Sequence, residues 1–149
     1  MPIHVEVVTQ ERKVFDEPEA TIVVLPGSEG EMGVLPHHAP VLTTLGDGEV
    51  IIRKGNAEER FAVYGGVVDV RPDRVVILAE LAESSFELDM AAIEAARESA
   101  ARMLEEGLPP EQNREAALAL RRAELALRIQ RKIQARGSQV MRIIEEAED

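Results

Sequence analysis

The composition of the chain changes near residue 86, and this change limits the folds that are open to it. Before that point, short runs rich in β-branched residues alternate with turns rich in glycine, proline and aspartate. Such runs are typical of strands joined by short connections. The sequence therefore predicts an antiparallel β-sandwich, or flattened barrel, over residues 1–86, with strands that include Thr21–Leu25, Glu49–Lys54, Arg60–Tyr64, Val67–Arg71 and Arg74–Leu81.

Residues 87–149 have a different character. Glycine and β-branched residues become scarce, and alanine, leucine, glutamate and arginine predominate, which favours helices. We expect two helices, Asp89–Glu106 and Arg114–Glu146, separated by the helix-stopping segment Gly107-Leu108-Pro109-Pro110. The second helix is expected to be weakened near Gly137-Ser138. The predicted fold class is thus β + α, a sandwich followed by a two-helix hairpin, with a domain boundary after residue 86.

Composition and charge exclude several classes of function. The 149 residues include 17 lysines and arginines against 28 aspartates and glutamates, a formal net charge of −11, whereas a nucleic-acid binder needs a basic surface. Cysteine is absent, which excludes disulfides, thiolate metal sites and cysteine nucleophiles. No apolar run approaches the roughly 20 residues that span a bilayer, and the start of the sequence lacks the pattern of a secretory leader. We therefore expect membrane association only through a partner.

One helix departs from this acidic balance. The segment Arg114–Arg142 carries eight basic residues and two acidic ones. At helical spacing its basic side chains lie beside an apolar stripe. Two interpretations of this segment are open at this point. The basic residues form a solvated face beside a packed stripe, or the segment is a mobile helix that meets an acidic partner. The stripe consists of Leu118, Leu125, Ile129, Ile133 and Val140.

No catalytic or metal-binding constellation stands out. The three histidines are His4, His37 and His38, and the adjacent pair would point in different directions on an extended chain. The glycine-rich segment 25–36 lacks the Gly-Lys-Ser/Thr of a phosphate-binding loop and carries two glutamates that would repel phosphate. A tight surface loop and a docking loop are the two interpretations of that segment.

Three segments together resemble the epsilon subunit of F-type ATP synthase. They are LPGSEGEMGVLPHHAPVLTTL, YGGVVDVRPDRVVILAE and the basic RRAELAL, in that order along nearly the whole chain. The resemblance implies a central-stalk rotor subunit without catalytic residues, which couples proton-driven rotation of the c ring to ATP synthesis in the catalytic head. It implies docking on the gamma subunit near His38. It also implies contact with the c ring through the loop residues Ser28, Glu29, Gly30, Glu31 and Met32.

In this family the helical hairpin is regulatory. It folds down against the sandwich, or extends along gamma toward the alpha and beta subunits and inhibits ATP hydrolysis. The resemblance then gives the basic helix a role, contact with beta in the extended state, through Arg121, Arg122, Arg128, Arg131 and Lys132.

Some family members bind ATP in the folded hairpin, with a pattern that begins Ile/Leu-Asp-x-x-Arg-Ala. Here Leu88 and Asp89 match, whereas Ala92 and Ile93 occupy the next two conserved positions, and Ile129 and Ile133 stand where later basic residues are expected. A triphosphate site without its arginines loses its main attraction. We therefore expect no cofactor and no tight ATP binding, although Arg97 or Arg128 could compensate.

A free-standing ligand-binding sandwich with a structural hairpin is the alternative function, and an apolar pocket with a few polar groups would favour it. For the synthase subunit, the expected location is the cytoplasmic face of a bacterial plasma membrane, with an organelle-encoded equivalent as the second expectation.

Overall fold

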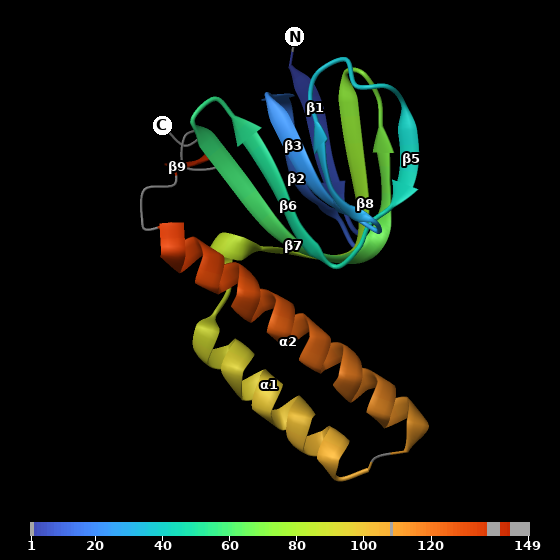
Figure 1. The fold of residues 1–149 in the computed structure, drawn as a ribbon, viewed down its shortest axis with the longest axis vertical. Helices are drawn as coiled ribbons and strands as arrows, with labels where there is room; N and C mark the ends of the chain where they lie inside the picture. Colours follow the sequence, from blue (N-terminus) through green and yellow to red (C-terminus); the bar gives the residue numbers. More distant parts are fainter. Residues whose placement is uncertain (1, 108, 137–140, 144–149) are drawn as a thin grey trace. The chain divides into compact units, whose positions relative to one another are not determined.

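The structure, a computed structural model, describes residues 2–107, 109–136 and 141–143, and for residues 133–136 and 141 it describes the backbone alone (Figure 1). These residues form two compact units. The first contains the strands up to Ser84 together with residues 141–143. The second begins at Ser85 and contains the helices.

The first unit is one continuous sheet folded into a sandwich. Its strands follow the order β2-β1-β8-β7-β6-β3-β4, and β5 and β9 also pair with β7. Most neighbours are antiparallel, but β1 pairs with β8 and β9 pairs with β7 in parallel. The strands are β1 (Ile3–Val8), β2 (Lys13–Ala20), β3 (Ile22–Gly27), β4 (Gly30–Val34), β5 (Val41–Thr44), β6 (Gly48–Lys54), β7 (Ala57–Val70), β8 (Arg74–Ser84) and β9 (Met141–Arg142).

The two strands predicted at Arg60–Tyr64 and Val67–Arg71 are one continuous strand, β7, because Gly65 and Gly66 bend the chain without ending the strand. Strand β7 therefore belongs to both layers of the sandwich. Its first half pairs with β6 and its last four residues pair with β5. Gly65 and Gly66 lie at the bend with φ of 70° and 123°, a region that other residues rarely adopt. A Cβ atom on Gly66 would lie 2.1 Å from the carbonyl oxygen of Leu78, so the two strands cross too closely for a side chain. Because of this bend, a single sheet forms both packed layers of the sandwich.

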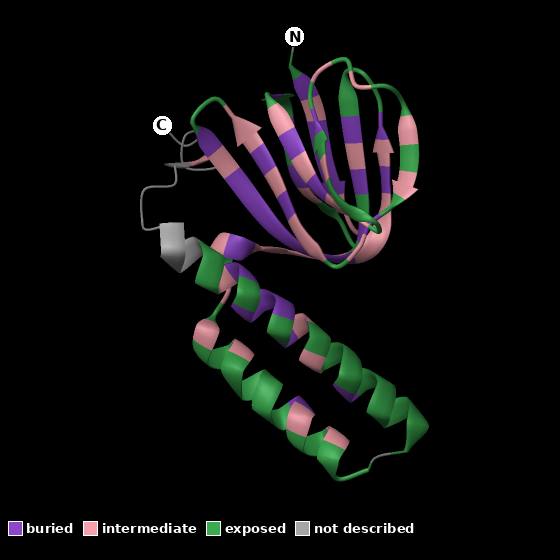
Figure 2. Cartoon of the chain, viewed as in Figure 1, coloured by how far each residue is buried: buried purple, intermediate pink, exposed green. Residues whose placement is uncertain are grey.

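The core of the sandwich follows from the alternation along each strand. Inward positions carry aliphatic side chains, and Val5, Val7, Val50 and Ile52 are completely buried. Burying such side chains stabilises a fold by roughly 1.5–3 kcal/mol each. Figure 2 shows the buried positions concentrated along the strands, whereas most of the hairpin surface is exposed.

The second unit is a helical hairpin. A short 3₁₀ helix, η1 (Ser85–Glu87), leads into α1 (Met90–Glu105), and α2 (Pro110–Arg136) follows. Gly107, with φ of 71°, ends the first helix, and Pro110 opens the second, where its missing N–H is not needed. Small residues lie buried along the helices, among them Ala100, Ala116 and Ala123. No helix among the described residues combines the length and the apolar character needed to cross a membrane.

The predicted sandwich followed by a helical hairpin is confirmed. The segment predicted as a loop, residues 25–36, is for the most part the β3–β4 hairpin. The helix predicted to run to Glu146 was wrong, because Met141 and Arg142 form strand β9. The boundary after residue 86 stays a prediction.

The predicted apolar stripe is confirmed in part. Leu125 and Ile129 are buried, but Leu118 is 49% exposed. The side chain of Ile133 and the whole of Val140 lie outside the described residues.

Candidate functional site

The tip of the β3–β4 hairpin is a tight, acidic projection. Ser28 and Glu29 form the turn between the register partners Gly27 and Gly30. A Cβ on Gly27 would lie 2.7 Å from the carbonyl oxygen of Gly30, so the turn requires glycine there. The structure therefore brings the five predicted ring-facing residues together on one tip.

The side chains of this tip divide by face. Glu31 follows Gly30 on β4 and is exposed, as is Glu29 in the turn. Met32, on the opposite face of β4, packs against the core of the sandwich. The polar side chains are thus available for contact, and the methionine fixes the tip to the fold.

A second turn presents the adjacent histidines. His37 has φ of 69°, and its N–H donates to the carbonyl of Pro72 at 2.8 Å. The backbone N–H of His38 donates to the carbonyl of Leu35 at 3.2 Å, and its Nδ1 lies 2.7 Å from the carbonyl oxygen of Ala39. The imidazole of His38 thus contacts the backbone of the same turn.

One outer face of the sandwich is more apolar than alternation predicts. The register places Thr44, Val67, Leu78 and Val8 in one row across four strands. The next row contains Leu42, Asp69, Val76 and Glu6. Leu42 is 72% exposed and Leu78 is 45% exposed. We call the apolar residues of these rows the outer apolar face: Val8, Leu42, Val67, Val76 and Leu78.

Sequence reasoning missed the outer apolar face. Its signal was present, because β8 carries aliphatic residues at outward as well as inward positions. Such a run is typical of a strand that is covered on both faces. Exposed apolar patches of this kind commonly mark interaction surfaces.

An ion-pair network lies next to the outer apolar face. Glu6 accepts bonds from Lys13, at 3.3 Å, and from Arg74, while His4 Nε2 lies 2.5 Å from Asp16 Oδ1. The bond to His4 lowers the pKa of Asp16, and the bond to Glu6, followed by the charge of Asp16, raises the pKa of Lys13. Ligand atoms of His4, Glu6 and Asp16 come within 4.8 Å of one another. Because two cations already neutralise Glu6, the geometry fits an ion-pair network better than a metal site.

The five basic residues predicted to contact beta lie along α2. Arg121, Arg128, Arg131 and Lys132 are exposed, and Arg122 is half-buried. Two of them, Arg128 and Arg131, line a hollow of about 390 Å³ together with Arg97, Glu124 and Leu127. The hollow thus gathers three guanidinium groups and one carboxylate, and it unites Arg97 and Arg128, the two residues that could compensate for lost ATP ligands.

Asp89 has a structural role that the motif comparison did not identify. It is the N-cap of α1, and its Oδ1 accepts the N–H groups of Ala91 and Ala92 at 3.1 and 3.3 Å. Aspartate is among the preferred residues at this position. The match of Asp89 to the ATP-binding pattern is therefore explained by helix capping as well.

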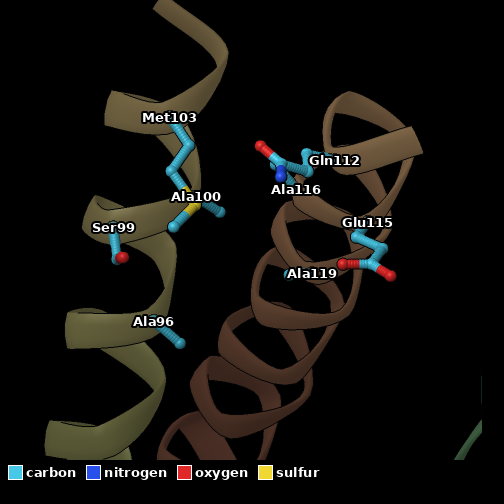
Figure 3. Close-up of a pocket in the computed structure, with 8 residues that line it drawn as sticks. All are labelled: Ala96, Ser99, Ala100, Met103, Gln112, Glu115, Ala116 and Ala119. Atoms are coloured by element: carbon cyan, nitrogen blue, oxygen red, sulfur yellow. The ribbon is translucent and has the colours of Figure 1, made fainter. Parts of the chain in front are cut away.

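A further hollow of about 610 Å³ lies between α1 and α2 (Figure 3). Figure 3 shows that side chains of both helices face it. Half of the lining residues are alanines, and the one charged group is the carboxylate of Glu115, so the lining offers no cation to attract a phosphate. The lining comprises Ala96, Ser99, Ala100 and Met103 from α1, and Gln112, Glu115, Ala116 and Ala119 from α2.

Comparison with known proteins gives a consistent result. The family model described as ATP synthase, Delta/Epsilon chain, beta-sandwich domain matches residues 2–85. A protein named ATP synthase epsilon chain from Dehalococcoides mccartyi is 45% identical over 131 residues, which cover 87% of this chain and 93% of that protein. The protein of the same name from Syntrophobacter fumaroxidans is 45% identical over 130 residues, covering 87% of this chain and 96% of the relative.

Solved structures share the fold. A chain of the Euglena gracilis mitochondrial ATP synthase aligns with a TM-score of 0.65 and 22% identity, over 90% of this chain and 80% of that one. A chain from the central stalk and c ring of the Tetrahymena thermophila mitochondrial enzyme aligns with a TM-score of 0.56 and 16% identity, over 87% of this chain and 97% of that one. From the family match and the sequence relatives together, the chain belongs to the ATP synthase delta/epsilon family, among the proteins named ATP synthase epsilon chain.

Proposed function

We propose that this chain is a non-catalytic rotor subunit of the central stalk of an F-type ATP synthase, where it couples rotation of the c ring to ATP synthesis in the catalytic head. The observation that carries the proposal is the 45% identity to epsilon chains over 87% of the sequence, which extends beyond the sandwich into the hairpin. A coupling part needs a rigid body with more than one contact surface. The sandwich offers an acidic tip and an outer apolar face for that purpose.

The gamma subunit is the proposed partner of the outer apolar face. Leu42 and Leu78 would become buried in such a contact, and the adjacent cations and carboxylates would fix its orientation. The turn of His37 and His38 is joined to the β7–β8 turn through Pro72, so His38 lies beside the connection that borders this face. The proposed contact of His38 with gamma is therefore part of one larger surface.

The c ring is the proposed partner of the β3–β4 tip. Ser28, Glu29, Gly30 and Glu31 are exposed there, and Glu31 is the proposed main polar contact. A hairpin tip closed by a two-residue turn is expected to transmit torque better than a long flexible loop would. Through the ring and the rest of the complex, the subunit would be held at the cytoplasmic face of a bacterial membrane.

The hairpin is the proposed inhibitory element. Arg121, Arg122, Arg128, Arg131 and Lys132 would meet acidic residues of beta when the hairpin extends. Single exposed ion pairs contribute little, about 0–1 kcal/mol each, so the contact would act as a group. Tight ATP binding is not part of the proposal, because Ala92 and Ile93 replace the expected arginine and alanine.

Leu42→Asp tests the docking of gamma. Leu42 is 72% exposed, so the substitution should leave the thermal midpoint of the chain nearly unchanged, while a charge placed in an apolar contact weakens binding by about tenfold or more. Binding of the full chain to a gamma-containing catalytic head is measured by titration. Gln10→Asp adds the same charge in the exposed β1–β2 turn and serves as the control.

Three results are informative. Loss of binding in Leu42→Asp alone supports the assigned surface. Equal binding by Leu42→Asp and the wild type would move gamma to another surface of the sandwich. Failure of the wild-type chain to bind the head at all, combined with binding of a metabolite, would favour the free-standing ligand-binding module.

A further inference from the structure

The C-terminal strand β9 occupies an edge of β7 that β8 leaves open. Strand β8 pairs with β7 as far as Phe61, which lies opposite Ser84. Beyond that point β9 takes over, with Met141 opposite Ala57 and Arg142 opposite Glu58. The chain therefore leaves the sheet at Ser84, forms the helical hairpin, and returns to the same strand a few residues away.

Arg142 neutralises a carboxylate that faces the core. Glu59 alternates along β7 with the core residues Ala57 and Phe61, and its side chain is 0% exposed. Arg142 Nε donates to Glu59 Oε1 at 3.1 Å, and Arg142 Nη2 donates to Glu59 Oε2 at 3.0 Å. Bidentate pairs of this kind are strong, and removing one partner of a buried pair is strongly unfavourable.

Ile143 adds an apolar contact at the same end. It is 3% exposed and belongs to the hydrophobic core cluster of the sandwich. Two consecutive residues of the C-terminal segment thus complete the sandwich, one through charge and one through apolar burial. The short strand is therefore a docked part of the fold.

The docked strand restricts the helices through chain length. Helix α2 ends at Arg136 and β9 begins at Met141, so four residues connect them. These residues allow a separation of at most roughly 17 Å between the end of α2 and the start of β9. Helix α2 has 27 residues and a length of about 40 Å, so while β9 stays paired the C-terminal end of α2 cannot move away from the sandwich by the length of the helix.

We propose that β9 is a latch that tethers the end of α2 to the sandwich in a non-inhibiting state, and that the latch must leave β7 before the hairpin can inhibit ATP hydrolysis. This inference rests on the inhibitory role given above under the proposed function. Release of β9 from β7 separates Glu59 from Arg142 and exposes Ile143. The latched state is therefore favoured until contacts of the hairpin with the catalytic head compensate for the loss of these interactions. The latch is thus a regulatory contact built into the sandwich.

The test uses the full chain in three forms. Arg142→Ala removes the cation and should release the strand. The pair Ala57→Cys and Met141→Cys places two cysteines at register partners in a chain that has none of its own, so oxidation should lock the strand. Arg53→Ala is the matched control, because it removes a neighbouring arginine that pairs with Glu58 at 3.3 Å and not with Glu59.

Two measurements are made on each form. The first is hydrogen exchange of the β7 amides at residues 57–60 in the isolated full chain. We expect Arg142→Ala to raise the local opening constant by about tenfold or more, because charge-assisted bonds are lost, whereas Arg53→Ala should resemble the wild type. The second is ATP hydrolysis by a catalytic head to which the chain is added. We expect stronger inhibition with Arg142→Ala, no inhibition with the oxidised cysteine pair, and recovery on reduction.

Each outcome bears on a different step. Unchanged exchange in Arg142→Ala, or inhibition by the oxidised pair equal to that by the reduced pair, would overturn the latch. If exchange responds as expected but no form of the chain inhibits hydrolysis, the inhibitory role fails and the docked strand has no inhibition to regulate.

Discussion

At the scale of single residues, Asp89 has a structural role that is distinct from its match to a nucleotide-binding pattern. Its carboxylate caps α1 through two backbone N–H groups. Asp89→Ala should destabilise the first turn of α1 by about 1 kcal/mol, whereas Asp89→Asn should preserve most of the cap. Hydrogen exchange of the first-turn amides measures the effect. Equal exchange in both variants and the wild type would show that the cap contributes nothing.

Asp16 gives the sandwich a specific acid dependence. Its pKa is lowered from the ordinary value of 3.8, chiefly by the hydrogen bond with His4. A lowered pKa in the folded state means that the contribution to stability is present above pH 3.8 and disappears as pH falls through the lower, folded value. Asp16→Asn should therefore be less stable than the wild type near pH 5, and the two thermal midpoints should converge as the pH falls below 3.8. A constant difference between the two thermal midpoints at every pH would contradict the assigned role of Asp16.

Residue roles were predictable where they depend on nearby sequence. The glycines and glutamates of segment 25–36 indicate a tight acidic surface feature, and the structure has a turn there. The pairing of Glu59 with Arg142 could not be predicted, because the two residues are 83 positions apart. Nothing near either residue in the sequence identifies its partner, so only the folded register brings them together.

At the scale of elements, the bend of β7 depends on Gly66. A side chain there would meet the backbone of Leu78 at 2.1 Å, and φ of 123° would strain any other residue. Gly66→Ala should therefore lower the free energy of unfolding by about 2 kcal/mol or more. Gly33→Ala is the control, because no atom lies within 4 Å of its Cβ position. Thermal midpoints that fall equally in the two variants would rule out a special role for the bend.

The elements were predicted unevenly for physical reasons. Long runs with a clear period, such as α1 and β8, were found because local pattern and tertiary packing agree. Strand β2 was missed because its sequence, KVFDEPEA, contains a proline and several acidic residues. Strand β9 was assigned to a helix because two residues carry no period, and its pairing with β7 overrides local propensity.

At the scale of the whole molecule, charge is distributed unequally. The chain carries a formal charge of −11, yet the described part of α2 exposes a row of cations that includes Arg121, Arg128 and Lys132. Association with an acidic surface would therefore depend on whether the cations of α2 face that surface, and not on the net charge of the chain. The same unequal distribution of charge explains why the residue pattern left both a solvated face and a partner contact open for this helix.

Neutralising part of this row tests the inhibitory contact directly. The double variant Arg121→Gln and Arg128→Gln should weaken inhibition of ATP hydrolysis by on the order of threefold to tenfold, because each exposed ion pair contributes at most about 1 kcal/mol. The control, Arg12→Gln with Arg102→Gln, makes the same charge change at two exposed positions outside the row. Inhibition is measured at low and high salt, and the wild-type effect should decline with salt more steeply than that of the double variant. If control and test variants inhibit equally at every salt concentration, the row of cations is a solvated face, and the inhibitory contact must come from other residues of the hairpin.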